Sequence, residues 1–248
     1  MMSNFINVLT RLSEENVSVK IMADYLVDNG YENEIFIDMM SLPWFQRNHM
    51  EKISLIQALF DDGIVNIGLI KELCNALVSA DTDKWHDVYE AVSRIVEKSD
   101  LFSRDMKMLL AHYLEIMYAK GMSDCGNLAE RLYGKIGVEG YVYDEYREDV
   151  VRVKLARIAY SCNSFNGRDM LGKLREVKRR LKRSGNTQCL GMVHYYKAVC
   201  MQRGEVKPCD YKDAAYHMRK SSQKGFALAE VFIRYNRLEK PFETSRIY

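Results

Sequence analysis

The chain contains very few of the residues that break helices or shape tight turns. Only 3 of its 248 residues are proline and 14 are glycine, well below the average usage of about 5% and 7%. An all-β or α/β fold needs turn residues at the end of nearly every strand, and this sequence does not supply them. Methionine, leucine, alanine and long charged residues, which favour helices, are abundant. We therefore predict an all-α fold.

Apolar residues recur at helical spacing along much of the chain. One such stripe consists of Ile53, Ile56, Leu59 and Phe60, and it ends at Gly63, as expected where a helix stops in a left-handed turn. The same spacing predicts further helices over 19–29, 33–40, 67–80 and 85–98. The connections between these segments are short, which favours antiparallel neighbours in a bundle or a solenoid.

From about residue 105 the glycines become periodic. One set, at Gly121, Gly167 and Gly204, marks the ends of alternate helical segments, and a second set closes the segments between them. The second set consists of Gly140, Gly185 and Gly225. The pattern predicts helix-turn-helix repeats of about 40 residues. A repeat of that size cannot bury its apolar face alone, so we expect the copies to stack around one continuous core.

The last repeat has a specific pattern. Residues 199–229 read VCMQRGEVKPCDYKDAAYHMRKSSQKGFALA. The segment resembles the Sel-one-like repeat, a branch of the tetratricopeptide-type helical repeats, and the region 105–198 resembles it at fewer positions. The matching residues are Gly204, Val206, Asp210, Ala214, Ser221, Ser222, Gly225 and Ala229. The resemblance implies a right-handed α-solenoid of helix-turn-helix repeats, built as an adaptor or scaffold for other proteins rather than as an enzyme.

These patterns divide the chain into three parts. We expect a divergent α-helical N-terminal region at 1–104, repeats at 105–238 and a C-terminal tail at 239–248. The resemblance also implies that a partner protein or peptide is held on the concave solenoid surface, which the first helix of each repeat lines. In the last repeat the residues expected there are His194, Tyr195, Lys197 and Met201.

The net charge of +2 hides a strong asymmetry along the chain. Residues 1–150 contain 14 Lys and Arg against 26 Asp and Glu, a net charge of −12, whereas residues 151–248 contain 22 against 8, a net charge of +14. Such a field either lets the two halves attract each other or presents one acidic and one basic surface to partners. A homodimer formed through acidic and basic halves is one version of the second alternative.

The densest positive charge lies in 173–183, KLREVKRRLKR, where only Glu176 opposes seven basic residues. Apolar residues at helical spacing predict an amphipathic helix with one cationic face. The candidate partner-binding residues on this face are Lys178, Arg179, Lys182 and Arg183.

This basic helix has several interpretations. It suits an acidic protein partner, nucleic-acid phosphates or an anionic membrane surface, or it is the solvated back of a helix. An acidic protein agrees best with a solenoid that binds proteins. The alternative function is a nucleic-acid-associated regulator that uses this helix, with bases stacked on Tyr195, Tyr196 or Tyr211.

Sequence motifs for catalysis or cofactor binding are absent. There is no GxSxG and no phosphate-binding glycine loop, and the spacing of His194, Cys200, Cys209 and His217 does not match a metal site. We expect no enzyme activity, cofactor or metal. The six cysteines form no CxxC pair, no export signal begins the chain, and no run of about 18 apolar residues occurs. We therefore expect a cytoplasmic protein with reduced cysteines and no membrane span.

Overall fold

The computed structural model describes residues 40, 46, 48–136, 147–160, 167–186, 189–203 and 211–236. Within these ranges every regular element is helical and no strand occurs, so the all-α fold is confirmed there. The chain divides into two compact units, Met1–Tyr113 and Leu114–Tyr248. The division falls inside helix α8 (Arg104–Lys120), whereas the expected boundary at 104/105 lies at the start of this helix.

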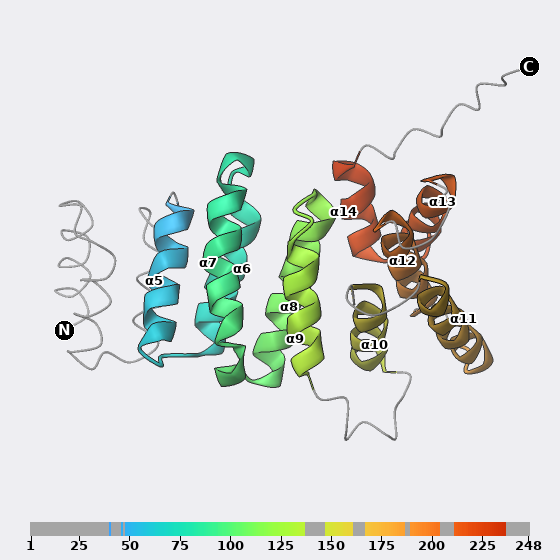
Figure 1. Ribbon diagram of the computed structural model, residues 1–248, viewed down its shortest axis with the longest axis horizontal. Coiled ribbons are helices and arrows are strands. Elements are labelled where there is room, and N and C mark those ends of the chain that lie inside the picture. The colour runs from blue at the N-terminus through green and yellow to red at the C-terminus, as the bar shows by residue number, and fades with distance from the viewer. Residues whose placement is uncertain are drawn as a thin grey trace, which may run out of the picture. The chain divides into compact units, whose positions relative to one another are not determined.

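The described part of unit 1 is helical. It contains α5 (His49–Asp61), α6 (Ile67–Ser79) and α7 (Trp85–Glu97), which Figure 1 labels, with the short 3₁₀ helices η1 (Thr82–Lys84) and η2 (Ser99–Leu101) and the start of α8. The helices expected over 67–80 and 85–98 are confirmed as α6 and α7, and Gly63 has the expected positive φ of 81° after α5. The segment 19–29 and most of 33–40 lie outside the described residues, as does the tail 239–248.

A buried ion pair joins the first two of these helices. Lys52 on α5 is only 1% exposed, and its Nζ lies 2.8 Å from Glu72 Oε2 on α6. A buried ammonium is tolerated only when a carboxylate compensates for its lost hydration. This pair therefore fixes the register between α5 and α6. Asn66 is the N-cap of α6, because its side chain accepts a hydrogen bond from the Leu69 backbone N–H in the first turn of that helix.

Unit 2 is arranged around one helix that is apolar on all sides. Besides the end of α8, its elements are α9 (Cys125–Lys135), α10 (Glu148–Tyr160), α11 (Gly167–Arg183), α12 (Cys189–Gln202), α13 (Tyr211–Ser222) and α14 (Ala227–Tyr235). Twelve of the fourteen residues of α12 are buried, as expected for a helix without a polar face. Helices α10, α11 and α13 pack against α12 (Figure 1).

The periodic glycines lie at helix ends wherever the structure describes them. Gly121, Gly185 and Gly225 follow α8, α11 and α13 with φ values of 119°, 75° and 77°, a conformation that residues with a Cβ rarely adopt. Gly167 is the first residue of α11. The predicted positions are confirmed for Gly121, Gly185 and Gly225, whereas Gly167 begins α11 instead of ending the helix before it. Gly140 and Gly204 lie outside the described residues.

The cysteines in the described ranges are reduced. Cys74, Cys125, Cys189 and Cys200 are free and buried, and burial raises the pKa of Cys74 and of Cys125 to about 12. The other two cysteines are in segments that the structure does not describe. As far as the described chain goes, each helix is too short or too polar to cross a membrane.

The core of unit 2 contains a charged side chain with no solvent exposure, Glu115 on α8. Its Oε2 accepts hydrogen bonds from Tyr133 Oη on α9 at 2.6 Å and from Arg152 Nη2 on α10 at 2.7 Å. Its Oε1 accepts one from Tyr196 Oη on α12 at 2.7 Å. Four helices therefore meet at one carboxylate.

The environment of this carboxylate also fixes the protonation of its partners. Burial, and then the charge of Glu115, holds the pKa of Tyr133 and of Tyr196 well above the ordinary value, so both hydroxyls remain donors. Burial alone would lower the pKa of Arg152, but Tyr133 and Glu115 raise it. The guanidinium therefore stays charged beside the carboxylate.

Removing the carboxylate should destabilise unit 2 strongly. We expect Glu115→Ala to lower the free energy of unfolding by about 3–5 kcal/mol, because it leaves a buried guanidinium without its counter-charge. Tyr133→Phe, which removes one hydrogen bond, should cost about 1–2 kcal/mol. Urea denaturation followed by circular dichroism measures both.

The matched control is Glu230→Ala on α14, because Glu230 is exposed and should change stability by less than about 0.5 kcal/mol. A loss below about 1 kcal/mol for Glu115→Ala would contradict the structural role of the carboxylate.

Candidate basic binding site on helix α11

Helix α11 is the amphipathic basic helix that the sequence predicts. Its buried residues are Leu171, Leu174, Val177 and Leu181, and the helix packs against α12 and α10. Most of its charged residues lie outside this apolar stripe and reach solvent. The helix therefore presents cationic side chains to solvent next to the surfaces where it packs against α10 and α12.

The four candidate residues on α11 fall into two groups. Arg179, Lys182 and Arg183 are exposed, whereas Lys178 is half-buried and its Nζ lies 3.4 Å from His194 Nε2 on α12. The structure therefore joins two residues, Lys178 and His194, that the sequence analysis assigned to separate surfaces.

The candidate residues on α12 do not form a surface. Tyr195 is 0% exposed and Met201 is 8% exposed, so their assignment to a partner-binding face is corrected: they belong to the core. The reason is that α10, α11 and α13 cover α12 from several sides. His194 is also largely buried, and Lys197 is half-buried.

The same burial removes the proposed base-stacking residues. Tyr195 and Tyr196 have no exposed surface, and the Tyr196 hydroxyl is bound to Glu115. Neither ring can stack on a nucleic-acid base, and the side chain of Tyr211 lies outside the described residues. The nucleic-acid alternative thus loses two of its three aromatic residues.

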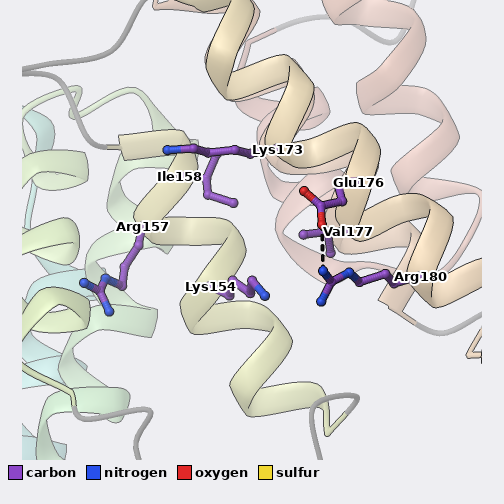
Figure 2. A pocket seen from close by; sticks show the side chains of 7 residues that line it. All are labelled: Lys154, Arg157, Ile158, Lys173, Glu176, Val177 and Arg180. Carbon is purple, nitrogen blue, oxygen red and sulfur yellow. Dashed lines mark hydrogen bonds and ion pairs between the residues drawn. The ribbon is translucent and has the colours of Figure 1, made fainter.

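A pocket of about 420 Å³ lies between α10 and α11 (Figure 2). Helix α10 supplies three of its lining residues and α11 the other four: Lys154, Arg157, Ile158, Lys173, Glu176, Val177 and Arg180. We call this pocket the basic groove. Four cationic side chains line it against one carboxylate, and Ile158 and Val177 give it an apolar part.

The charges of the basic groove are only partly compensated. Arg180 Nη2 lies 2.7 Å from Glu176 Oε1 in an exposed pair four residues apart on α11. Lys154 and Arg157 on α10 are exposed and form no ion pair among the described residues. The groove therefore keeps a net positive charge next to apolar surface.

Sequence reasoning missed the α10 side of this groove. Lys154 and Arg157 stand three residues apart and so share one side of a helix, but nothing in the sequence pairs that side with α11. The signal available was the spacing itself, in KLAR at 154–157.

A second cluster lies where α11, α12 and α13 meet. His194 Nδ1 on α12 is 2.8 Å from His217 Nδ1 on α13, and the ring centroids are 5.0 Å apart. The Lys178 ammonium can only donate, so His194 Nε2 accepts and His194 Nδ1 carries a proton. His194 Nδ1–H then donates a hydrogen bond to His217 Nδ1. The proton of the neutral His217 ring is therefore on Nε2.

Both rings are neutral at pH 7. Burial, followed by Lys178 and Lys224, lowers the pKa of His194 from 6.5 to about 4. Burial, followed by Lys197, lowers that of His217 to about 3. The pKa of Lys178 is itself lowered by burial and by the neighbouring Lys182 and Lys224.

This contact bears on the metal question raised by the sequence. Among the four residues whose spacing does not match a metal site, His194 and His217 are in contact. Within the described ranges, however, no group of three or more His, Cys, Asp and Glu side chains gathers as metal ligands would.

Comparisons of this chain with protein-family models, curated proteins and solved structures find no match.

The histidine pair predicts that stability falls on acidification. Because both folded pKa values lie below the ordinary 6.5, the unfolded chain takes up protons first as the pH drops. The stabilisation is therefore complete above pH 6.5 and is lost as the pH falls toward 4. Between about pH 7.5 and about pH 5, each histidine that stays neutral should lower the free energy of unfolding by about 2 kcal/mol.

Urea denaturation at the two pH values tests this, with the double variant His194→Gln and His217→Gln expected to lose most of that pH dependence. The control His86→Gln removes a histidine on α7 whose side chain is 81% exposed, and it should behave as the wild type does. Equal pH dependence in the double variant and the wild type would refute the assignment.

Proposed function

We propose that this protein is a non-enzymatic interaction adaptor that binds an acidic segment of a partner protein in the basic groove between α10 and α11. The observation that carries the proposal is the lining of the groove, where cations from two helices surround an apolar part made by Ile158 and Val177. Neighbouring cations repel one another when the groove is empty, and a carboxylate between them removes that repulsion.

The groove suits a peptide segment better than a small ion. Its volume of about 420 Å³ accommodates several side chains, and its apolar part would take one aliphatic or aromatic side chain. The Arg180 guanidinium can donate two parallel hydrogen bonds to the two oxygens of a carboxylate. We therefore expect an occupant with one apolar residue flanked by Asp or Glu.

The scaffold that we propose for this groove is a right-handed solenoid of Sel-one-like repeats. The helix pairs α8 with α9, α10 with α11 and α12 with α13 would be its repeats, and their spacing of about 40 residues and the glycines after α8, α11 and α13 support it. The groove would then lie between the two helices of the middle repeat.

A protein partner is favoured over nucleic acid by the kind of residue that lines the groove. None of its seven residues is aromatic, whereas single-stranded nucleic acid is usually held by base stacking on aromatic rings. The acidic half of a second copy of this chain, with its net charge of −12 over residues 1–150, is one partner that fits the same chemistry.

Charge reversal on α10 tests the proposal. The probe is a fluorescein-labelled synthetic peptide with one leucine flanked by glutamates, and anisotropy measures its affinity. The double variant Lys154→Glu and Arg157→Glu should weaken binding about tenfold or more, because it replaces two cations of the groove with anions. Both residues are exposed, so the fold should tolerate the change.

The matched control reverses two exposed charges of α11 that do not line the groove, Arg175→Glu and Arg179→Glu. It should change the affinity by less than about threefold, since long-range charge effects are screened by salt. Equal losses in both variants would place binding on the whole basic helix instead. Tighter binding of duplex DNA than of the peptide would favour the nucleic-acid regulator.

A further inference from the structure

Positive charge converges on the histidine pair from every element around it. Lys178 comes from α11, Lys197 from α12 and Lys220 from α13, and Lys224 follows the end of α13. These four lysines lower the pKa of His194, and Lys197 and Lys178 lower that of His217. The cluster is distinct from the basic groove, with which it shares no residue.

The packing of α13 on α12 fixes one of these cations in place. Ser221 Oγ donates a hydrogen bond to the Gly191 carbonyl oxygen at 2.7 Å. A Cβ added at Gly191 would lie 3.3 Å from the Lys224 Cβ, so the absence of a side chain at Gly191 lets the chain after α13 approach α12 closely. The stem of Lys224 is therefore held over the first turn of α12 by its backbone.

The neutral rings form the floor of this cluster. His194 and His217 are mostly buried and keep 8% and 9% of their surface exposed. The short contact between the two Nδ1 atoms and the contact with Lys178 hold both rings in one orientation. Lys178 is thus carried by a packed helix, and Lys224 lies in the turn that follows α13.

We propose that His194, His217, Lys178 and Lys224 form a binding site for a phosphoryl group. A phosphoryl group carries nearly two negative charges at neutral pH and has three strong acceptor oxygens. Ammonium groups from two segments and the Nε2–H group of His217 match those oxygens better than they match the two oxygens of a carboxylate, while His194 holds the His217 ring in place through Nδ1. No bond is made or broken in this binding.

The site is independent of the acidic peptide proposed for the groove. The phosphoryl group is either free phosphate or a phosphorylated side chain, and the two sources share the same contacts with the protein. Binding also favours protonation of the imidazoles, because the added negative charge offsets the surrounding ammonium groups. Phosphate should therefore bring the pKa of His194 back toward its ordinary value.

Isothermal titration calorimetry of the full chain with inorganic phosphate tests the site, at the same ionic strength as a sodium chloride reference. Lys178→Met and Lys224→Met should each weaken phosphate binding about tenfold, since each removes one charged donor. Lys178→Met should not lower the stability of the free protein, because it relieves the crowding of cations around His194. Weaker phosphate binding without a loss of stability separates the lost contact from misfolding.

The control is Arg183→Met, an exposed residue at the end of the same helix, which should change the affinity by less than about twofold. A histidine titration by NMR with and without phosphate gives a second readout, in which the pKa of both rings should rise. Heat and pKa changes equal to those with chloride would overturn the proposal. Equal losses in Arg183→Met and Lys178→Met would also overturn it.

A peptide pair separates the two sources. A phosphoserine peptide that binds more tightly than inorganic phosphate, while its unmodified form does not bind here, assigns the site to a modified protein side chain. Equal affinity of the phosphopeptide and phosphate assigns it to the free anion, and both outcomes support the site. The double variant Lys154→Glu and Arg157→Glu, which should lose binding of the acidic peptide to the basic groove, should bind phosphate and phosphopeptide as the wild type does. The two proposals can therefore fail separately.

Discussion

A carboxylate removed from water controls the geometry of unit 2. A buried charge costs several kcal/mol unless it is paired and fully hydrogen-bonded, and Glu115 is completely buried. Its donors come from α9, α10 and α12. Each of these helices must therefore have the register and rotation that bring one particular side chain to the same point on α8. Beside this network the Tyr160 ring makes edge-to-face contacts with the rings of Tyr118 and Tyr196, at centroid distances of 5.3 and 6.1 Å.

The same constraint positions the basic groove. Arg152 uses one side of α10 to reach Glu115. A helix rotates by about 100° per residue, so fixing Arg152 toward the core directs Lys154 and Arg157 elsewhere, and the structure has both at the groove with α11. The buried ion pair thus connects the core to the candidate site through the rotation of a single helix. A substitution of Glu115 would therefore alter the groove by changing the rotation of α10, although Glu115 does not line the groove.

Local features of the sequence predicted local features of the fold. The apolar stripes of α5, α6 and α7, the left-handed glycines after α8, α11 and α13, and the amphipathic character of α11 depend on neighbours within two turns of helix. The Glu115 network could not be predicted this way, because its four members are far apart in sequence and follow no period. Tyr195 was assigned to a surface because the repeat resemblance implies that the first helix of each repeat lines the concave face, but α10, α11 and α13 cover α12. A helix that is apolar on all sides gives no indication of which face is covered.

Lys178 differs from the exposed basic residues of α11 in its surroundings. The apolar stripe of α11 consists of Leu171, Leu174, Val177 and Leu181, and Lys178 lies at the edge of this stripe, four residues from Leu174 and three from Leu181. A half-buried ammonium at this position loses hydration, lies near Lys182 and Lys224, and contacts the neutral imidazole of His194. Burial and charge repulsion alone would favour an uncharged residue there. Sites that sacrifice stability in this way are typical of binding surfaces, and an anion is the one kind of ligand that turns this repulsion into attraction.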